Sequence, residues 1–347
     1  MLLQIDWFLI IEKFVLIAVI VTTALVVAMY STYAERKVAA FLQDRRGPNR
    51  AGPFGLLQPL ADGVKLFAKE EIIPLTSSKT LFVMGPLLAM ITATMTSAVI
   101  PWGWTIDVAG RQVPLQVADV NIGILYIFGV VSLGVYGIMI GGWASNNKYS
   151  LISAVRGASQ MISYELALGL SLIAVLMMVG DLKMSSIVNY QVQNGWNILY
   201  QPLGFLIFFI CALAECNRTP FDLPEAENEL NFGYHQEYSS MKLGFYLFAE
   251  YINMFISAVV MSTLFFGGYD IPFVNEAAYA GAWWIGLAGF VCLMLKAFLF
   301  IFLFMWIRWT IPRFRFDQLM NLGWKVLLPL ALANMILTAI VVLLLNK

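Results

Sequence analysis

Eight long runs of apolar residues are the strongest constraint in this 347-residue sequence. A helix needs about 20 mostly apolar residues to cross the ~30 Å hydrocarbon core of a bilayer, whereas a membrane β-strand needs only about 10. The runs have the length of helices, and no internal repeat relates them. They predict crossings at residues 14–33, 81–100, 121–142, 160–180, 202–216, 243–266, 283–307 and 326–345. The expected fold class is all-α: a polytopic transmembrane helix bundle of about eight spans, with a single integral membrane domain over residues 1–347.

The composition agrees with this class and excludes others. Hydrophobic residues make up 60% of the chain and charged residues 12%, against about 45–50% and about 25% in soluble domains. The formal net charge is +0, so nothing in the charge balance favours nucleic acid as a partner. Three cysteines cannot form a disulfide framework. The chain is therefore expected to act in a lipid bilayer.

Basic residues are distributed unequally between the loops. Sixteen Lys and Arg residues lie in the odd-numbered loops, whereas the even-numbered loops hold only Arg111 and Lys183. Because basic loops stay in the cytoplasm, the odd loops are expected there and both termini in the periplasm. The two main loops are a first cytoplasmic loop at 31–79 and an acidic cytoplasmic loop at 215–242. The pattern predicts a multi-pass protein of a bacterial inner (plasma) membrane.

Ionisable side chains occur where lipid makes them costly. Glu165, Glu250 and Lys296 lie inside predicted crossings, and Glu215 ends the short fifth one, whose apolar stretch is Leu203–Ala214. A charge at mid-bilayer costs about 2.5–3.5 kcal/mol, and such groups usually face a bundle interior and mark an ion or proton path. A structural pair of Glu250 with Lys296 is the alternative. The short crossing is expected to be tilted or buried, with its end in a polar cavity.

The first cytoplasmic loop combines turn signals with an amphipathic segment. Gly-Pro pairs at 47–48 and 52–53 favour turns. Apolar residues then recur at helical spacing over 56–67, opposite polar residues such as Asp62, which predicts a helix too short to span. This amphipathic surface helix is expected either to anchor the loop on the membrane or to form a wall of a cavity for a lipid-like substrate. Glu35 and Asp62 lie just outside the crossings and extend the set of acidic candidates.

The acidic loop holds four carboxylates between Asp222 and Glu229 and no basic residue. Pro220 and Pro224 prevent it from beginning as a regular helix. One interpretation is a solvated loop that faces a basic partner. Its many apolar and aromatic residues favour another, in which crowded, partly buried carboxylates raise one another's pKa and titrate as a coupled set. Such a set suits a redox-linked proton device.

Residues for metal and nucleotide chemistry are scarce. The chain has one histidine, His235, and cysteines at 211, 216 and 292, with no CxxC or HExxH pattern. The common phosphate-binding and dinucleotide-binding patterns are missing as well. We therefore expect no metal, haem, iron–sulfur or nucleotide site in this chain. His235 is expected to form hydrogen bonds within its loop.

Both loops carry long and specific motifs. Residues 35–70 read ERKVAAFLQDRRGPNRAGPFGLLQPLADGVKLFAKE, and residues 217–251 read NRTPFDLPEAENELNFGYHQEYSSMKLGFYLFAEY. They closely resemble the signature loops of the H-subunit family of bacterial NADH:quinone oxidoreductase (respiratory complex I), which is homologous to the first mitochondrial subunit of that complex. The resemblance covers nearly the whole chain and includes Ile162-Ser163-Tyr164-Glu165. One departure is Asn231, where the family usually has Val, and it affects local packing.

The resemblance implies that quinone, the substrate, enters from the bilayer through a tunnel between this chain and a peripheral arm. The flavin and iron–sulfur clusters would lie in partner subunits, so this chain alone would hold no catalytic residue and no cofactor. The implied partners are peripheral-arm quinone-module subunits and antiporter-like membrane subunits. The implied quinone-tunnel residues are Arg36, Arg45, Arg46 and Lys65. The implied proton-path residues are Glu35, Asp62, Glu165, Glu215, Glu225, Glu227, Glu229 and Glu250.

Three other functions remain open at this point. The homologous subunit of a membrane-bound hydrogenase would keep the fold and the proton path without quinone. A stand-alone proton or sodium transporter explains the buried carboxylates but not two large loops that look built to dock a partner. A purely structural anchor for a peripheral arm leaves the intramembrane carboxylates unexplained.

Overall fold

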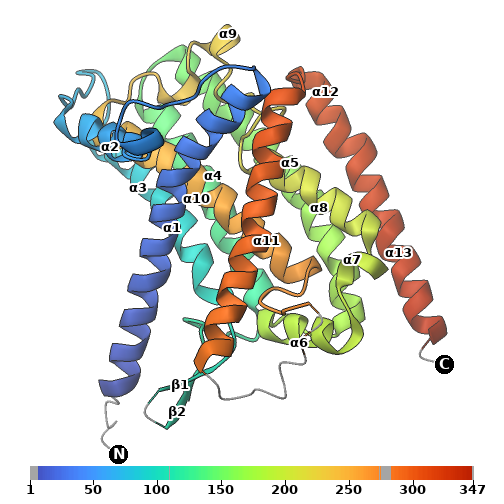
Figure 1. The fold of residues 1–347 in the computed structure, drawn as a ribbon. Coiled ribbons are helices and arrows are strands. Elements are labelled where there is room, and N and C mark those ends of the chain that lie inside the picture. The colour runs from blue at the N-terminus through green and yellow to red at the C-terminus, as the bar shows by residue number, and fades with distance from the viewer. Residues whose placement is uncertain (1–6, 109, 273, 275–282, 346–347) are drawn as a thin grey trace, which may run out of the picture.

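The computed structural model describes residues 7–108, 110–272, 274 and 283–345, and this part of the chain is predominantly helical (Figure 1). Seven of its helical segments are long and apolar enough to cross a membrane. They are α1 (Trp7–Leu42), α3 (Lys79–Met95, extended by a 3-10 turn to Val99), α4 (Gly123–Ala144), α5 (Lys148–Val179), α10 (Ser240–Phe265), α11 (Trp283–Thr310) and the continuous run from α12 (Phe316–Asn321) through a π-helical turn to α13 (Leu328–Leu345). The expected all-α membrane bundle is confirmed.

The fifth predicted crossing is a shorter apolar helix, α8 (Pro202–Glu215). It begins at Pro202, which fits a first helical turn because its missing N–H would have no helical acceptor there. About half of its residues are buried, in agreement with the expectation that it is enclosed by other helices.

The remaining elements are short and connect the long helices. Two strands, β1 (Ile106–Val108) and β2 (Arg111–Val113), pair antiparallel with Ile106 opposite Val113. The short helices are α2 (Gln58–Ala68), α6 (Met184–Asn194), α7 (Asn197–Tyr200) and α9 (Glu227–Leu230), with 3-10 turns at Pro53–Gly55 and Gly233–His235. The amphipathic helix predicted in the first loop is confirmed as α2.

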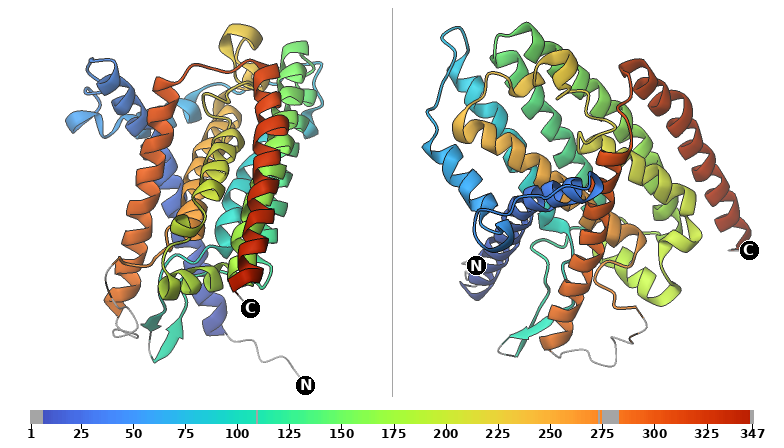
Figure 2. Two further views of the ribbon diagram at one scale, coloured as in Figure 1. Left: turned by 90° about the vertical axis from the view of Figure 1, so that its right-hand side faces the viewer. Right: turned by 45° about the horizontal axis from the view of Figure 1, so that its top comes forward.

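The two ends of the bundle differ in what they carry. Helices α2, α9 and α12 gather at one end, and the β-hairpin and α6 lie at the other, together with the start of α1 and the end of α13 (Figures 1 and 2). The first loop and the acidic loop therefore share one end of the molecule, as their common position among the odd-numbered loops requires.

Two helices are longer than the apolar runs that predicted them. Helix α1 continues to Leu42, so Glu35 and Arg36 lie on a helix and not in a loop. Helix α5 begins at Lys148, where the Asn147 side chain caps it by accepting a hydrogen bond from the Tyr149 N–H at 2.9 Å. Hydropathy marks where lipid begins, whereas helices end at caps and breakers, so both corrections have the same cause.

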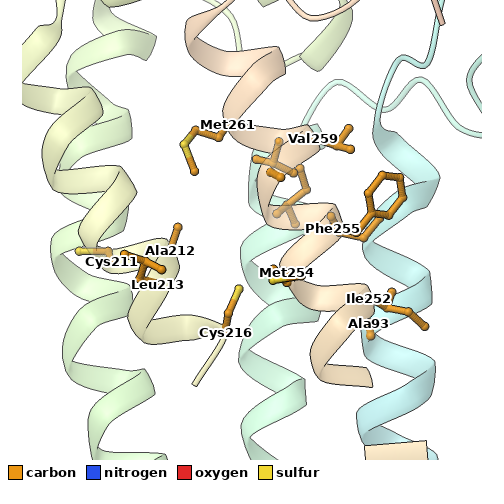
Figure 3. Packing of buried hydrophobic residues seen from close by; sticks show 14 of the residues in the cluster. Ala93, Cys211, Ala212, Leu213, Cys216, Ile252, Met254, Phe255, Val259 and Met261 are labelled. Atoms are coloured by element: carbon orange, nitrogen blue, oxygen red, sulfur yellow. The ribbon is translucent and has the colours of Figure 1, made fainter. Parts of the chain in front are cut away.

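Helix α10 forms the centre of the core. Its buried side chains, such as Phe255 and Met261, pack between α8 and α3 (Figure 3). Cys211 and Leu213 approach from α8, and Ala93 from α3. Most residues of the second half of α10 are buried, so this half of the helix is enclosed by protein.

Glycines allow α3, α4 and α10 to approach closely. A Cβ atom added to Gly141 of α4 would lie 1.9 Å from the Tyr246 hydroxyl oxygen, and one added to Gly85 of α3 would lie 2.8 Å from the Gly141 Cα. The Tyr246 hydroxyl donates a hydrogen bond to the Gly137 carbonyl oxygen at 3.0 Å. Small residues are the usual means by which membrane helices bring their backbones together.

Gly141→Ala is expected to destabilise the fold by about 1–3 kcal/mol, the usual cost of overpacking. The measurement is the thermal unfolding midpoint of the purified full chain in detergent, which should fall. Gly129→Ala is the matched control, because an added Cβ there meets nothing within 4 Å on the same helix. Alanine is the better helix former, so the control midpoint should hold or rise. Equal midpoints for the two variants would contradict the close packing at Gly141.

Candidate functional site

Glu35 is the centre of a buried ion cluster. This residue of α1 is 7% exposed. Its Oε1 lies 2.7 Å from Nη1 of Arg308 on α11, and its Oε2 lies 3.2 Å from Nη1 of Arg218. The Tyr251 hydroxyl of α10 donates to Oε2 at 2.8 Å, and the Arg218 guanidinium lies 4.1 Å above the Tyr251 ring. Three long helices and the segment after α8 therefore meet at one carboxylate.

A cavity of about 310 Å³ lies beside this cluster, and we call it the entry cavity. Its polar wall includes Glu35, Arg36, Arg45 and Asp62, and aromatic side chains of α10 and α11 complete it. Nη1 of Arg36 lies 2.8 Å from Oδ2 of Asp62, so α1 and α2 are joined across the wall. Helix α2 thus forms one side of a cavity, as one of its two interpretations predicted.

The other two implied tunnel residues lie away from this wall. Arg46 follows α1 and Lys65 lies on α2, and both side chains are exposed. Neither is among the described residues that line the entry cavity, whereas Arg36 and Arg45 are. The structure therefore brings two of the four residues together.

A second cavity of about 100 Å³ lies inside the bundle, and we call it the inner cavity. Glu165 of α5, Glu215 of α8 and Glu250 of α10 line it, in a wall that is otherwise mostly apolar. The Ser132 hydroxyl donates a hydrogen bond to Glu165, and the Tyr234 hydroxyl donates to Oε1 of Glu250 at 2.9 Å. A water molecule needs roughly 10–15 Å³ of such space, so the cavity has room for several. The fifth crossing therefore ends at a cavity that holds carboxylates, but the wall of this cavity is mostly apolar and not polar as expected.

The acidic loop folds back into the bundle. Most of residues 216–226 and 233–235 are buried. The Ser153 hydroxyl of α5 donates to the Pro224 carbonyl oxygen and accepts from the Tyr234 N–H at 3.0 Å. Gly233 has a φ of +60°, and a Cβ there would lie 1.9 Å from the Pro224 carbonyl oxygen, so only glycine fits. The interpretation of this segment as a solvated loop is wrong.

Glu229, one of the implied proton-path residues, lies apart from the other carboxylates. Glu229 is exposed, and its Oε2 lies 2.7 Å from Nη1 of Arg156. Glu227 begins α9, but its side chain lies outside the described residues. Among the implied proton-path residues, Glu35 and Glu250 are buried, Glu165, Glu215 and Glu225 are partly buried, and Asp62 lies at the wall of the entry cavity.

His235 lies between two of these carboxylates. Its Nδ1 is 3.6 Å from Oε1 of Glu225, and its Nε2 is 3.8 Å from Oε1 of Glu250. Both distances are too long for hydrogen bonds, and neither ring nitrogen has a hydrogen-bond partner among the described residues. The expectation that His235 forms side-chain hydrogen bonds within its loop is therefore wrong. Burial lowers the pKa of His235 to about 4, so its imidazole is neutral at pH 7.

The pKa values of two carboxyl groups in the acidic loop, Asp222 and Glu225, shift in opposite directions. Burial, reinforced by the charge of Glu225, raises the pKa of Asp222 to about 7, although Nη2 of Arg313 lies 2.8 Å from its Oδ2. Burial acts in the same sense on Glu225, but hydrogen bonding with Glu250 and the nearby Arg218 outweigh it and lower the pKa. The expected mutual raising of pKa is confirmed for Asp222 and wrong for Glu225.

Lys296 binds the backbone that follows the C-terminus of α10, at the end of the helix far from Glu250. Its ammonium group donates to the carbonyl oxygens of Phe266, Gly268 and Asp270 at 2.8, 2.8 and 2.7 Å. These carbonyls follow the C-terminus of α10, where a cation is favoured by the helix dipole. Glu250 lies about 24 Å away along the same helix, at 1.5 Å per residue. A structural pair of Glu250 with Lys296 is therefore wrong.

The chain is similar over nearly its whole length to proteins of one family. The NADH dehydrogenase family model matches residues 14–339. An NADH-quinone oxidoreductase H subunit of Cytophaga hutchinsonii is 63% identical over 333 residues, 96% of this chain and 97% of that protein. This chain belongs to the H-subunit family of NADH-quinone oxidoreductase. Further members are the H subunit of Flavobacterium johnsoniae, 62% identical over 335 residues and 96% of each chain, and that of Thermomicrobium roseum, 48% identical over 345 residues and 97% of each.

In this member of the H-subunit family, the structure adds functional candidates that sequence reasoning missed. Arg218, Arg308 and Tyr251 all contact Glu35, yet the two arginines counted only as loop charges in the sequence. Arg218 lies in the acidic loop just after the short α8, and this position is the signal that could have marked it. Nothing in the sequence marked Arg308 or Tyr251.

Glu35→Gln is expected to destabilise the chain by about 3–5 kcal/mol, because Arg218 and Arg308 would keep their charges without the carboxylate that compensates them. The thermal unfolding midpoint of the purified full chain should fall accordingly. Asp119→Asn is the control: its carboxylate pairs with Lys183 at 2.7 Å but is 39% exposed, so its loss should cost less than about 1 kcal/mol. If both variants unfold at the same temperature, the Glu35 cluster does not hold these helices together.

Proposed function

We propose that this chain, as the membrane H subunit of an NADH-quinone oxidoreductase, forms the membrane part of a quinone tunnel and the start of an acidic path that couples quinone reduction to proton movement. The observation that carries the proposal is the Glu35 cluster. One side of Glu35 lines the entry cavity. Arg218, which binds its other side, also acts electrostatically on Glu225 and Glu250.

The entry cavity suits an amphipathic quinone. Its aromatic wall fits a ring and an isoprenoid chain, while Arg36, Arg45 and Asp62 offer charge and hydrogen bonds to a polar head group. Ligand cavities are typically apolar with a few convergent polar groups. Electrons would come from flavin and iron–sulfur clusters in the partner subunits. This chain would supply the walls of the cavity, the charges and the proton-binding groups.

The acidic path would begin at the entry cavity, where reduction would change the charge of the quinone. Negative charge on a partly reduced quinone would compete with Glu35 for Arg218 and Arg308. A shift of Arg218 would change the electrostatic potential at Glu225 and Glu250, which would then exchange protons with the inner cavity and with Glu215 and Glu165. Six carboxylates take part in this proposal on geometry, namely Glu35, Asp62, Glu165, Glu215, Glu225 and Glu250. Glu227 and Glu229 take part on family resemblance alone.

The orientation and the partners follow from the same proposal. The loop end of the bundle, with α2 and α9, would face the cytoplasm and dock the peripheral-arm subunits of the quinone module, and both termini would face the periplasm. Antiporter-like membrane subunits would receive the acidic path within a bacterial inner membrane. The relatives named above are quinone oxidoreductase subunits, so a hydrogenase subunit or a stand-alone transporter is not favoured.

Arg36→Met is expected to weaken quinone reduction by about 10- to 100-fold in kcat/KM, the equivalent of one charge-assisted contact worth about 1.5–3 kcal/mol. NADH oxidation by ferricyanide should be unchanged, because that acceptor takes electrons from the partner module. Lys69→Met, an exposed change beyond the entry cavity, should leave both activities intact. A parallel loss of both activities in Arg36→Met would show that Arg36 acts in assembly and not at the quinone.

Glu215→Gln should lower quinone-reductase turnover and proton pumping by at least about tenfold, because the amide keeps the size of the side chain but cannot exchange a proton. The complex should still assemble, as judged by native gel electrophoresis and ferricyanide activity. Glu70→Gln, at an exposed position, is the control. Full pumping in assembled Glu215→Gln complexes would remove the inner cavity from the proton path.

A further inference from the structure

Glu225, His235 and Glu250 place three metal-ligating side chains around one buried point. One donor atom from each lies within 4.8 Å of the other two. They come from three separate parts of the chain: the segment after α8, the 3-10 turn Gly233–His235 and α10. The proposed function uses the two carboxylates but gives His235 no role.

The hydrogen bonding at this point is incomplete. Buried polar groups are nearly always satisfied, and an exception points to a bound water or ion. His235 is 1% exposed, and both of its ring nitrogens and Oε1 of Glu225 lack a hydrogen-bond partner among the described residues. A neutral imidazole has one lone pair to offer and a carboxylate has several, so these atoms can ligate a cation.

The distances fit a small divalent ion. Zinc binds nitrogen and carboxylate oxygen at about 2.0–2.2 Å, which places two tetrahedral ligand atoms about 3.4 Å apart. Nδ1 of His235 and Oε1 of Glu225 are 3.6 Å apart. Oε1 of Glu250 lies 3.8 Å from the other ring nitrogen, so the Glu250 carboxylate must turn toward Nδ1 to complete the set. The Tyr234 hydroxyl donates to Glu250 and orients it, as outer-shell partners of metal ligands do.

The charges favour a divalent cation as well. Two carboxylates and a neutral imidazole balance a charge of +2. Arg218, the cation that acts on both carboxylates, is itself hydrogen-bonded to Glu35. One nitrogen and two carboxylate donors suit a transition ion such as Zn²⁺, whereas Mg²⁺ prefers six oxygen ligands and keeps several waters.

We propose that Glu225, His235 and Glu250 form a binding site for a divalent transition-metal ion of the zinc type. The site goes beyond the proposed function: Glu225 and Glu250 exchange protons when the site is empty and ligate the ion when it is filled. Its test needs no quinone and no turnover. A failure of the metal site would therefore leave the quinone tunnel and the acidic path untouched.

The test is zinc binding to the full chain, purified in mild detergent with an affinity tag free of histidine. The bound ion is measured by elemental analysis after gel filtration, and its ligands by X-ray absorption spectroscopy. His235 is the one histidine of the chain, so an imidazole scattering signal can come from no other residue. The expected result is one zinc ion per chain with nitrogen and oxygen ligands that include imidazole. No bound zinc, or zinc on sulfur ligands alone, would overturn the site.

Two variants and one control complete the experiment. His235→Phe keeps aromatic packing against Tyr234 and Tyr246, and Glu225→Gln keeps the size of that side chain. Each should weaken zinc binding by at least about 100-fold, since loss of an outer-shell partner alone costs about 10- to 100-fold. Glu237→Gln removes a carboxylate of the same loop that instead accepts from Asn147, and should bind zinc as the unmodified chain does. Unchanged affinity in both ligand variants, with the unfolding midpoint retained, would overturn the proposal.

Discussion

The buried carboxylate of Glu35 depends on most of the bundle being in place. Moving a charge out of water costs several kcal/mol, and the cost is offset only when partners meet it in good geometry. Here those partners are Arg308, Arg218 and Tyr251, each from a different segment. A buried ion pair of this kind adds little net stability compared with apolar packing, but breaking it is costly. The cluster therefore fixes how α1, α10 and α11 are arranged.

Close packing at glycines holds α3, α4 and α10 together, as the Glu35 cluster holds α1, α10 and α11. Where glycines bring these helices together, tyrosine hydroxyls take the place of apolar contacts: Tyr246 bonds to Gly137, and Tyr238 bonds to Phe82 while its ring stacks on the Phe82 ring at 4.1 Å. Tyr238 thus ties the segment after α9 to α3, and Tyr246 ties α10 to α4. The same arrangement presents the Tyr234 hydroxyl to Glu250. The close packing of these helices thus goes together with the placement of the Tyr234 hydroxyl and Glu250 at the inner cavity.

Local pattern predicted the crossings and α2, because apolar runs and helical spacing are signals that lie within a few turns of chain. Positions within or beside apolar runs singled out Glu35 and the inner carboxylates, and the family resemblance assigned them to a proton path. Contacts between distant segments were beyond the sequence: Arg218 and Glu35 are separated by 183 positions, and no periodicity relates residues so far apart. The burial of the acidic loop depends on Ser153 and on the left-handed Gly233, neither of which is marked by composition. His235 was misinterpreted for the same reason, since its two carboxylate neighbours arrive from separate segments.

The magnitude of electrostatic coupling limits how the two cavities can communicate. Two unit charges about 10 Å apart interact by roughly 1.7 kcal/mol at an effective dielectric constant near 20, a little more than one pKa unit. A charge change at the entry cavity can therefore shift a distant carboxylate only modestly, and such a shift moves a proton only if the acceptor is already close to balance. Glu225 and Glu250 lie together in one place, and Arg218 acts electrostatically on both. In the proposed path, a small displacement of Arg218 would alter both its bond to Glu35 and its effect on this pair, so one guanidinium would relate the two cavities.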